Sequence, residues 1–392
     1  MNNKLISKAL FAIFFLGLVQ VTSAQDDEVN LSGQQNIIST AVTFLDIAPE
    51  SRGGAMGNSG VAISPDVNSQ HWNPAKYAFI EKESGVALSY TPWLRKLVND
   101  INLYYLSGYK RLDDMQTISA SIRYFSLGDI TFMSEEAVEQ GSASPNEFAI
   151  DAAYSRVLSE HISGSVAFRY IRSDLQIGLS GTSGSDNYQA GNSFAADLAF
   201  YYQNEIELGG NDANLSAGIN ISNIGNKISY DGNTEQFIPT NLRLGTALRS
   251  QLDQYNELTV SLDFNKLLVP TPDNQTTEDN TSVFQSDDVS VISGIFQSFS
   301  DAPGGLEEEL QEINISFGAE YLYNQQFAVR AGYFHEHENK GNRKYFTAGV
   351  GLRFNMLTID ASYIIPMVQN NPLANTVRFT LGLDLDQMIG QN

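Results

Sequence analysis

Histidines are the side chains most able to bind a metal or act as a base, and the chain contains four of them. His335 and His337 alternate with Glu336 and Glu338, and alternate residues of an extended strand share one face. Two such ligands on a connection between strands do not complete the four-coordinate site that zinc prefers. We therefore predict no metal site in this segment.

Motifs of hydrolytic enzymes are missing as well. The chain has no G-x-S-x-G nucleophile elbow and no H-E-x-x-H zinc motif. His71 lies in a Gly-rich stretch and His161 at a predicted turn, so no histidine falls in the central span of a predicted strand. We predict a protein that is not an enzyme, with no catalytic residue and no cofactor. A lipid-modifying membrane enzyme is the weakest alternative.

The Gly-rich stretch, residues 44–79, is a second candidate site. Residues 52–57 (RGGAMG) do not form a phosphate-binding loop, because they lack the Lys-Ser/Thr ending and the flanking strand and helix. Glycine instead permits close backbone packing in a confined space. Asn73 and Pro74 suit the cap and first position of a short helix. The pattern predicts a compact segment placed inside or beneath the strands that follow.

From Ser84 onward, apolar side chains recur at alternate positions, which is the period of a β-strand. In residues 344–354, one face is apolar and the other is small and polar apart from Tyr345 and Arg353. A solvated surface would carry more charge, whereas a barrel lumen has this character. Single charges on the lumen-facing positions are Arg123, Asp151, Arg169, Asp197, Arg243, Asp263, Glu320 and Arg330.

About fourteen such strands are predicted, and the connections between them alternate in length. The strands are expected to begin near Ser84, Ile101, Met115, Asn146, His161, Ser193, Asp212, Asn241, Glu257, Gln311, Gln326, Lys344, Met356 and Asn375. An even strand count with short turns on one side and long loops on the other is typical of bacterial outer-membrane barrels. The sequence predicts an all-β, 14-stranded antiparallel transmembrane barrel whose termini are periplasmic.

The N-terminus and composition support an exported protein. Residues 1–24 combine Lys4 and Lys8, an apolar core and small residues before Gln25, which is typical of a signal peptide. Its removal takes away two lysines and no acid, leaving 21 basic and 45 acidic residues, a net charge of −24 that disfavours nucleic acid as a partner. The expected organisation is a signal peptide (1–24), a periplasmic segment and hatch (25–83), and the barrel (84–392).

The longest connection, residues 267–310, is expected to contain a helix. Asp287 or Asp288 could cap it, and the spacing places Ile292, Ile295, Phe296 and Phe299 on one apolar face. That face either folds over the mouth of the barrel or binds a partner. If it binds a partner, the aromatic pair is the expected anchor, because aromatic side chains dominate interface hot spots.

The pattern Gly57…Gly60-Val61-Ala62…Asn73-Pro74-Ala75, followed by about fourteen alternating strands, resembles the FadL family of outer-membrane transporters. Within that family, the stretch FLDIAPESRGGAMGNSGVAISPD is similar to the barrel subunits of the type IX secretion system. The resemblance implies a barrel with an N-terminal hatch. The implied hatch residues are Gly53, Gly54, Gly57, Gly60, Asn73, Pro74 and Ala75.

The resemblance also implies a function and partners. Type IX barrels of this kind collect secreted cargo, through its C-terminal signal domain, from a giant translocon barrel (SprA/Sov-like). They deliver it to a sortase-like attachment complex (PorU-like) at the cell surface, in contact with outer-membrane lipid. The alternative, from the FadL relatives, is a transporter of long-chain hydrophobic molecules that is gated by the hatch.

Overall fold

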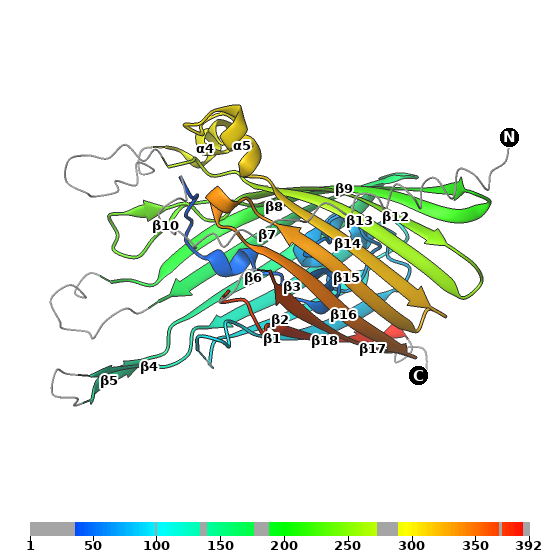
Figure 1. Ribbon diagram of the computed structural model, residues 1–392, viewed down its shortest axis with the longest axis horizontal. Helices are drawn as coiled ribbons and strands as arrows, with labels where there is room; N and C mark the ends of the chain where they lie inside the picture. The colour runs from blue at the N-terminus through cyan, green and yellow to red at the C-terminus, as the bar shows by residue number, and fades with distance from the viewer. Residues whose placement is uncertain are drawn as a thin grey trace.

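The computed structural model describes residues 36–98, 100–133, 139–175, 188–272, 289–367 and 371–386. Within these residues, fourteen antiparallel strands close a barrel in the order β1-β18-β17-β16-β15-β14-β13-β12-β9-β8-β7-β6-β3-β2 (Figure 1). The predicted signal peptide and the predicted helix caps Asp287 and Asp288 lie outside the described residues.

The strands of the barrel match the predicted segments closely. They are β1 (Ser84–Pro92), β2 (Asn102–Arg111), β3 (Gln116–Ser126), β6 (Asn146–Ser159), β7 (Ile162–Asp174), β8 (Gly191–Leu208), β9 (Asn211–Gly225), β12 (Asn241–Gln251), β13 (Asn256–Leu267), β14 (Asn314–Tyr323), β15 (Phe327–His335), β16 (Lys344–Phe354), β17 (Leu357–Pro366) and β18 (Val377–Asp384). The predicted all-β barrel of fourteen antiparallel strands is confirmed. The largest difference in a strand start is at β14, because the helix α5 (Leu306–Gln311) continues to the residue where the strand was expected to begin.

The barrel has two unlike ends. Short turns join β2 to β3, β6 to β7, β8 to β9, β12 to β13, β14 to β15 and β16 to β17, and we call this the turn end. The other end, the loop end, carries the hairpins β4 (Ile130–Met133) with β5 (Glu139–Ala143) and β10 (Ile228–Ser229) with β11 (Glu235–Gln236), and the helix α4 (Val291–Gln297) with α5. In Figure 1 the loop end is on the left, and β1 begins and β18 ends at the turn end.

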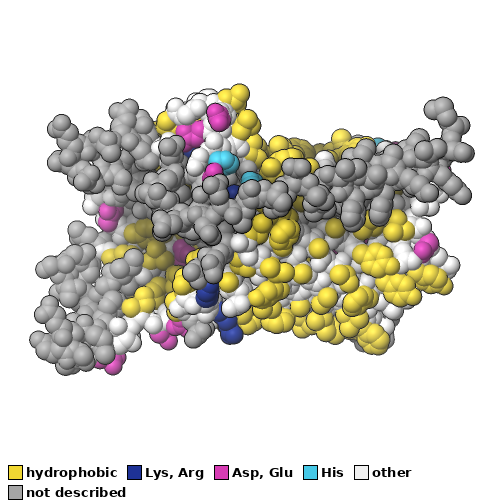
Figure 2. Space-filling model, in the orientation of Figure 1, with side chains coloured by type: hydrophobic (Ala, Val, Ile, Leu, Met, Phe, Trp, Pro, Cys, Tyr) yellow, Lys and Arg dark blue, Asp and Glu magenta, His cyan; other side chains and the backbone are white. Residues whose placement is uncertain are grey.

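The two faces of the wall differ as the alternation predicts. Large apolar side chains cover the outside in a continuous belt, for example Phe168 (70% exposed) and Phe194 (64%), and Figure 2 shows this belt in yellow. All eight charged residues predicted to face the lumen are buried, with at most 8% exposure. Large apolar side chains thus face outward, and the inward face is mostly small or polar apart from an apolar cluster near the loop end.

The N-terminal residues 36–83, which we call the plug segment, fill the inside of the barrel (blue in Figure 1). They form η2 (Thr43–Asp46), α2 (Ser51–Ala55), α3 (Ser69–Trp72) and η3 (Pro74–Phe79). Toward the loop end, Phe44 and Leu45 of this segment pack in an apolar cluster against Leu103, Ile171 and other inward side chains of the wall. Among the described residues, no helix is long and apolar enough to cross a membrane.

Candidate functional site

The glycines of the plug segment lie where a side chain has no room. A Cβ on Gly57, which has φ +69°, would lie 2.5 Å from the carbonyl oxygen of Tyr333 on β15. A Cβ on Gly53 or Gly60 would overlap the ring of Trp72, and one on Gly54 would lie 3.1 Å from the Arg378 side chain. These four predicted hatch glycines therefore let the backbone pack directly against the wall and against itself.

The wall has matching glycines, which the sequence reasoning did not single out. They line neighbouring strands from β9 to β16 on the inner face, where a Cβ would overlap plug residues 55–61: Gly218, Gly245, Gly318, Gly332 and Gly349. Together they form a shallow groove that receives this part of the plug segment. The only sequence signal was glycine recurring at inward positions of the strands, such as Gly349 in β16.

Asn73, Pro74 and Ala75 attach the plug segment to the opposite wall. The Asn73 side chain accepts a hydrogen bond from the Ala75 N–H (3.0 Å) and donates to the Val61 and Phe200 carbonyl oxygens (3.1 and 2.9 Å). Ser155 on β6 and Ser163 on β7 donate to the Pro74 and Ala75 carbonyl oxygens, both at 2.7 Å. Asn73 thus both caps η3 and joins the segment to β8.

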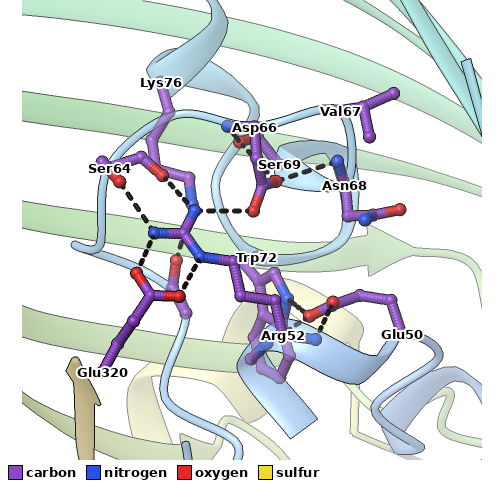
Figure 3. Close-up of polar contacts among 12 residues, drawn as sticks. Glu50, Arg52, Ser64, Asp66, Val67, Asn68, Ser69, Trp72, Lys76 and Glu320 are labelled. Atoms are coloured by element: carbon purple, nitrogen blue, oxygen red, sulfur yellow. Dashed lines mark hydrogen bonds and ion pairs between the residues drawn. The ribbon is translucent and has the colours of Figure 1, made fainter. Parts of the chain in front are cut away.

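A buried network of ion pairs is the strongest polar link between plug and wall (Figure 3). The Arg52 guanidinium donates to both carboxylate oxygens of Glu320 on β14 (3.1 and 2.8 Å) and to Asp66 (2.9 Å). Its remaining donors reach Ser64, so all of its N–H directions are used. Glu320 also accepts from Arg330 (2.6 Å), which in turn pairs with Asp360 (2.6 Å). The network holds α2 against β14, β15 and β17.

Glu50 holds the plug segment together from within. Its carboxylate accepts hydrogen bonds from the Gly53 N–H (2.7 Å) and the Arg52 N–H (2.5 Å), which caps the start of α2. The same carboxylate accepts from the Trp72 indole N–H at 2.8 Å, as Figure 3 shows. This one side chain therefore joins α2 to α3.

The histidines take structural roles among the described residues. His71 lies next to the Arg123 guanidinium (2.7 Å), which also donates to the Leu45 carbonyl oxygen (2.6 Å). His337 accepts from the Asn339 N–H at the start of a 3-10 turn, and His335 contacts the Tyr333 hydroxyl. No group of three or more His, Asp or Glu side chains in the described part of the chain could hold a metal ion.

A cavity of about 360 Å³ opens beneath the plug segment at the turn end. Its lining combines charged side chains, such as Arg52, Asp66 and Arg353, with the aromatic rings of Tyr109 and Tyr201. The loop-end side of the plug is instead closed by the apolar cluster around Phe44.

The helices α4 and α5 form a second candidate site at the loop end (Figure 1). Their base is a buried cluster of five charged side chains. Lys266 pairs with Glu309 and Glu312 (2.9 and 2.6 Å), and Lys340 pairs with Glu308 and Glu312 (2.7 and 3.0 Å). Burial raises the pKa of Glu308, but hydrogen bonds from Lys340, the Gly304 N–H and Asn36 hold it below the ordinary value.

The exposed side of these helices and of the turn after α4 carries several large apolar side chains. Exposed fractions are 59% for Ile292, 73% for Phe296, 50% for Phe299, 76% for Leu306 and 60% for Leu310. We call these five residues the loop-end apolar patch. Ile295, predicted to share the face, is only half-exposed, because Gly294 and Ser298 form the buried side of α4 and Ile295 lies at its margin. The helix starts at Val291, with Ser290 as its cap.

Known barrels resemble the chain in shape but only weakly in sequence. The Pseudomonas putida toluene transporter TodX is 12% identical over 86% of this chain and 96% of that chain, with a TM-score of 0.49. The CymD monoaromatic hydrocarbon channel is 12% identical over 88% and 97% (TM-score 0.46), and a Pseudomonas aeruginosa FadL homologue is 10% identical over 89% and 99% (TM-score 0.42). No curated protein matches the sequence.

The family model of the type IX secretion system protein PorV matches residues 30–274. The matched region contains the whole plug segment, with its glycines and its Asn73-Pro74-Ala75 sequence, and the strands through β13. Since the match covers more than half of the sequence, the chain belongs to the PorV family of type IX secretion system proteins.

Proposed function

We propose that this barrel is a non-enzymatic cargo carrier of the type IX secretion system. It binds exported proteins through their C-terminal signal domain as they leave a giant translocon barrel, and it passes them to a sortase-like attachment complex at the cell surface. Membership of the PorV family supports a role in the type IX secretion system. The loop-end apolar patch supports binding of a protein partner.

The patch is the observation that carries the proposal. Five large apolar side chains, 50–76% exposed, lie on α4, on the turn that follows it and on α5, in an otherwise acidic chain. Exposed apolar patches of this kind are typical of interaction sites. The buried Lys–Glu cluster beneath them fixes the helices, so little conformational entropy would be lost when a partner binds. Phe296 and Phe299 are the proposed anchors.

The location we infer is the bacterial outer membrane, with the loop end outside the cell and both termini in the periplasm. The apolar belt of the wall suits a lipid environment. Long loops of bacterial outer-membrane barrels are extracellular and short turns periplasmic. The loop-end apolar patch would then face the cell exterior, where cargo is attached.

The dense contacts of the plug segment favour a carrier that holds cargo outside its lumen. Arg52, Asn73 and the glycines Gly57 and Gly60 bind the segment to the wall or pack it tightly. We propose that the plug seals the barrel and keeps the loop-end surface in shape while cargo is bound there.

The test is affinity purification from native outer membranes in mild detergent. The Phe296→Ser, Phe299→Ser double variant is expected to lose co-eluting cargo and the very large translocon barrel. A Tyr255→Ser variant is the control, because this aromatic side chain is about as exposed (52%) as Phe299 (50%) but lies at the turn end. Co-elution that is unchanged in the double variant, with heat-modifiable mobility intact, would contradict the proposal.

A transporter of long-chain hydrophobic molecules is the second candidate. The observation that favours it is the apolar cluster around Phe44 and Leu45 inside the barrel, which a displaced plug would open to an apolar ligand. This function predicts lipid-like density in the lumen and loss of uptake when residues 44–79 are deleted. This transporter function would be excluded if the intact barrel took up no hydrophobic molecules and cargo release persisted after deletion of residues 44–79.

A further inference from the structure

Aromatic side chains form a row on the outside of the barrel near the loop end. Tyr90, Tyr104 and Tyr124 are cross-strand neighbours on β1, β2 and β3, with ring centroids 5.3 and 6.3 Å apart. The row continues through Phe148, Tyr170 and Phe194 on β6, β7 and β8, and Tyr333 pairs with Phe346 on β15 and β16. Aromatic girdles of this kind mark the level at which the hydrocarbon region meets the lipid headgroups.

Cations lie one step beyond this row, toward the loop end. Arg172 follows Tyr170 by two positions on the same outward face of β7, and Lys344 precedes Phe346 by two positions on the outward face of β16. Arg95 lies in the connection that directly follows β1. Figure 2 shows Lys and Arg side chains at the loop-end margin of the apolar belt. We call Arg95, Arg172 and Lys344 the basic rim.

The turn that holds Arg95 is anchored to the inside of the loop end. Trp93 and Leu94 pack against the apolar cluster inside the loop end, and Leu94 adopts a left-handed conformation with φ 51°. The Leu97 N–H then donates to the Leu94 carbonyl oxygen (2.8 Å). Leu97 and Val98 are 63% and 44% exposed beside the cation. A branched residue held in this strained conformation indicates that the position of the turn is fixed by its surroundings.

From this arrangement we propose that the basic rim binds phosphate groups of membrane lipid headgroups in the leaflet at the loop end. The three cations lie just beyond the girdle, at the depth of the headgroups, while the mature chain as a whole is strongly acidic. Cations near a membrane surface attract anionic lipids, and apolar neighbours such as Leu97 enter the acyl boundary. Arg172 also lies 3.8 Å from Asp174 and 3.4 Å from Asn192, so the lipid phosphate would compete with the carboxylate there.

This lipid site does not depend on cargo transfer, and it is tested directly on the purified barrel. The variant Arg95→Gln, Arg172→Gln, Lys344→Gln is compared with the wild type by native mass spectrometry in detergent, with diphosphorylated lipid A as the probe. Because several strands separate the three cations, each is expected to contact its own lipid phosphate, and the lipid binding at each position is expected to weaken roughly fivefold when its cation is removed. The matched control is Lys110→Gln, Arg156→Gln, which removes two outward cations at the turn end and is expected to bind as the wild type does.

Three results would overturn the proposal. Equal binding of dephosphorylated lipid A would assign the affinity to acyl chains alone. An equal loss in the turn-end control would assign it to the general charge of the barrel. A stable adduct with inorganic phosphate alone, lost in the triple variant, would make the rim a site for free phosphate. If the triple variant does not fold, the Lys344→Gln variant gives the same comparison at one position.

Discussion

Replacing Arg52 with methionine should release the plug segment from the wall without unfolding the barrel. The Arg52 side chain is 5% exposed and pairs with both Glu320 and Asp66. Among the described residues, its loss leaves Arg330 as the one cation paired with Glu320 and Asp360, so buried negative charge exceeds positive charge in the network. Removing one partner of a buried ion pair typically costs about 3–5 kcal/mol. The population with a detached plug should therefore rise about 10²–10⁴-fold.

Thiol labelling measures this population cleanly, because the chain contains no cysteine. A Ser59→Cys reporter is buried in the docked plug segment, next to Ser261 on β13, and is expected to label slowly. Adding Arg52→Met should speed labelling and raise the ion conductance of the barrel in planar bilayers. Strand pairing is unchanged by the substitution, so heat-modifiable mobility should stay as in the wild type.

Two controls make the experiment decisive. The double variant Arg52→Met, Glu320→Gln removes both charges of the pair and should label more slowly than Arg52→Met alone. Arg172→Met breaks the exposed pair with Asp174 on the outer wall, away from the plug segment, and should change nothing measurable. Labelling and conductance that stay at the wild-type level in Arg52→Met would refute the reasoning that this network holds the plug segment.

Gly57→Ala should lower the unfolding midpoint, because its Cβ would meet the Tyr333 carbonyl oxygen. Gly232→Ala is the control: its φ is similarly positive, but a Cβ there has no atom within 4 Å, so it should lower the free energy of unfolding by only about 1 kcal/mol. Phe296→Ser and Phe299→Ser should change stability by less than about 0.5 kcal/mol, as thermal unfolding in detergent would show, while partner binding is lost. The pKa of Glu308 lies below its ordinary value in the folded protein, so its stabilising contribution is present above pH 4.5 and is lost as pH falls through the lowered value. Proteolysis of the α4–α5 unit should therefore accelerate at low pH, and this effect should be absent in Glu308→Gln.

Local patterns in the sequence are enough to predict the barrel. Alternation with period two gives the strands and the face of each side chain, so Arg169 and Asp263 could be assigned to the lumen before the structure. The strand count was predicted from the number of alternating runs that the connections separate. The glycines of residues 53–60 indicated a confined backbone, and the Asn73-Pro74 pair indicated a capped turn.

The loop-end helix shows where local pattern is insufficient. Helical spacing predicted an apolar face containing Ile295 and Phe296, but not the direction in which that face points. The direction depends on Gly294 and Ser298, which pack inward, and on the buried pairing of Lys266 with Glu309 and Glu312. These partners are separated by more than forty residues in the chain.

The strand count, the inward and outward faces and the unequal ends of the barrel follow from the spacing of neighbouring residues along the chain. Which wall residues meet the plug segment depends on how the closed barrel packs. Arg52 and Glu320 are 268 positions apart, and Gly57 reaches β15 and β16 only because closure of the barrel brings those strands around it. Such contacts are set by strand register and by packing in a closed space, which no local period encodes.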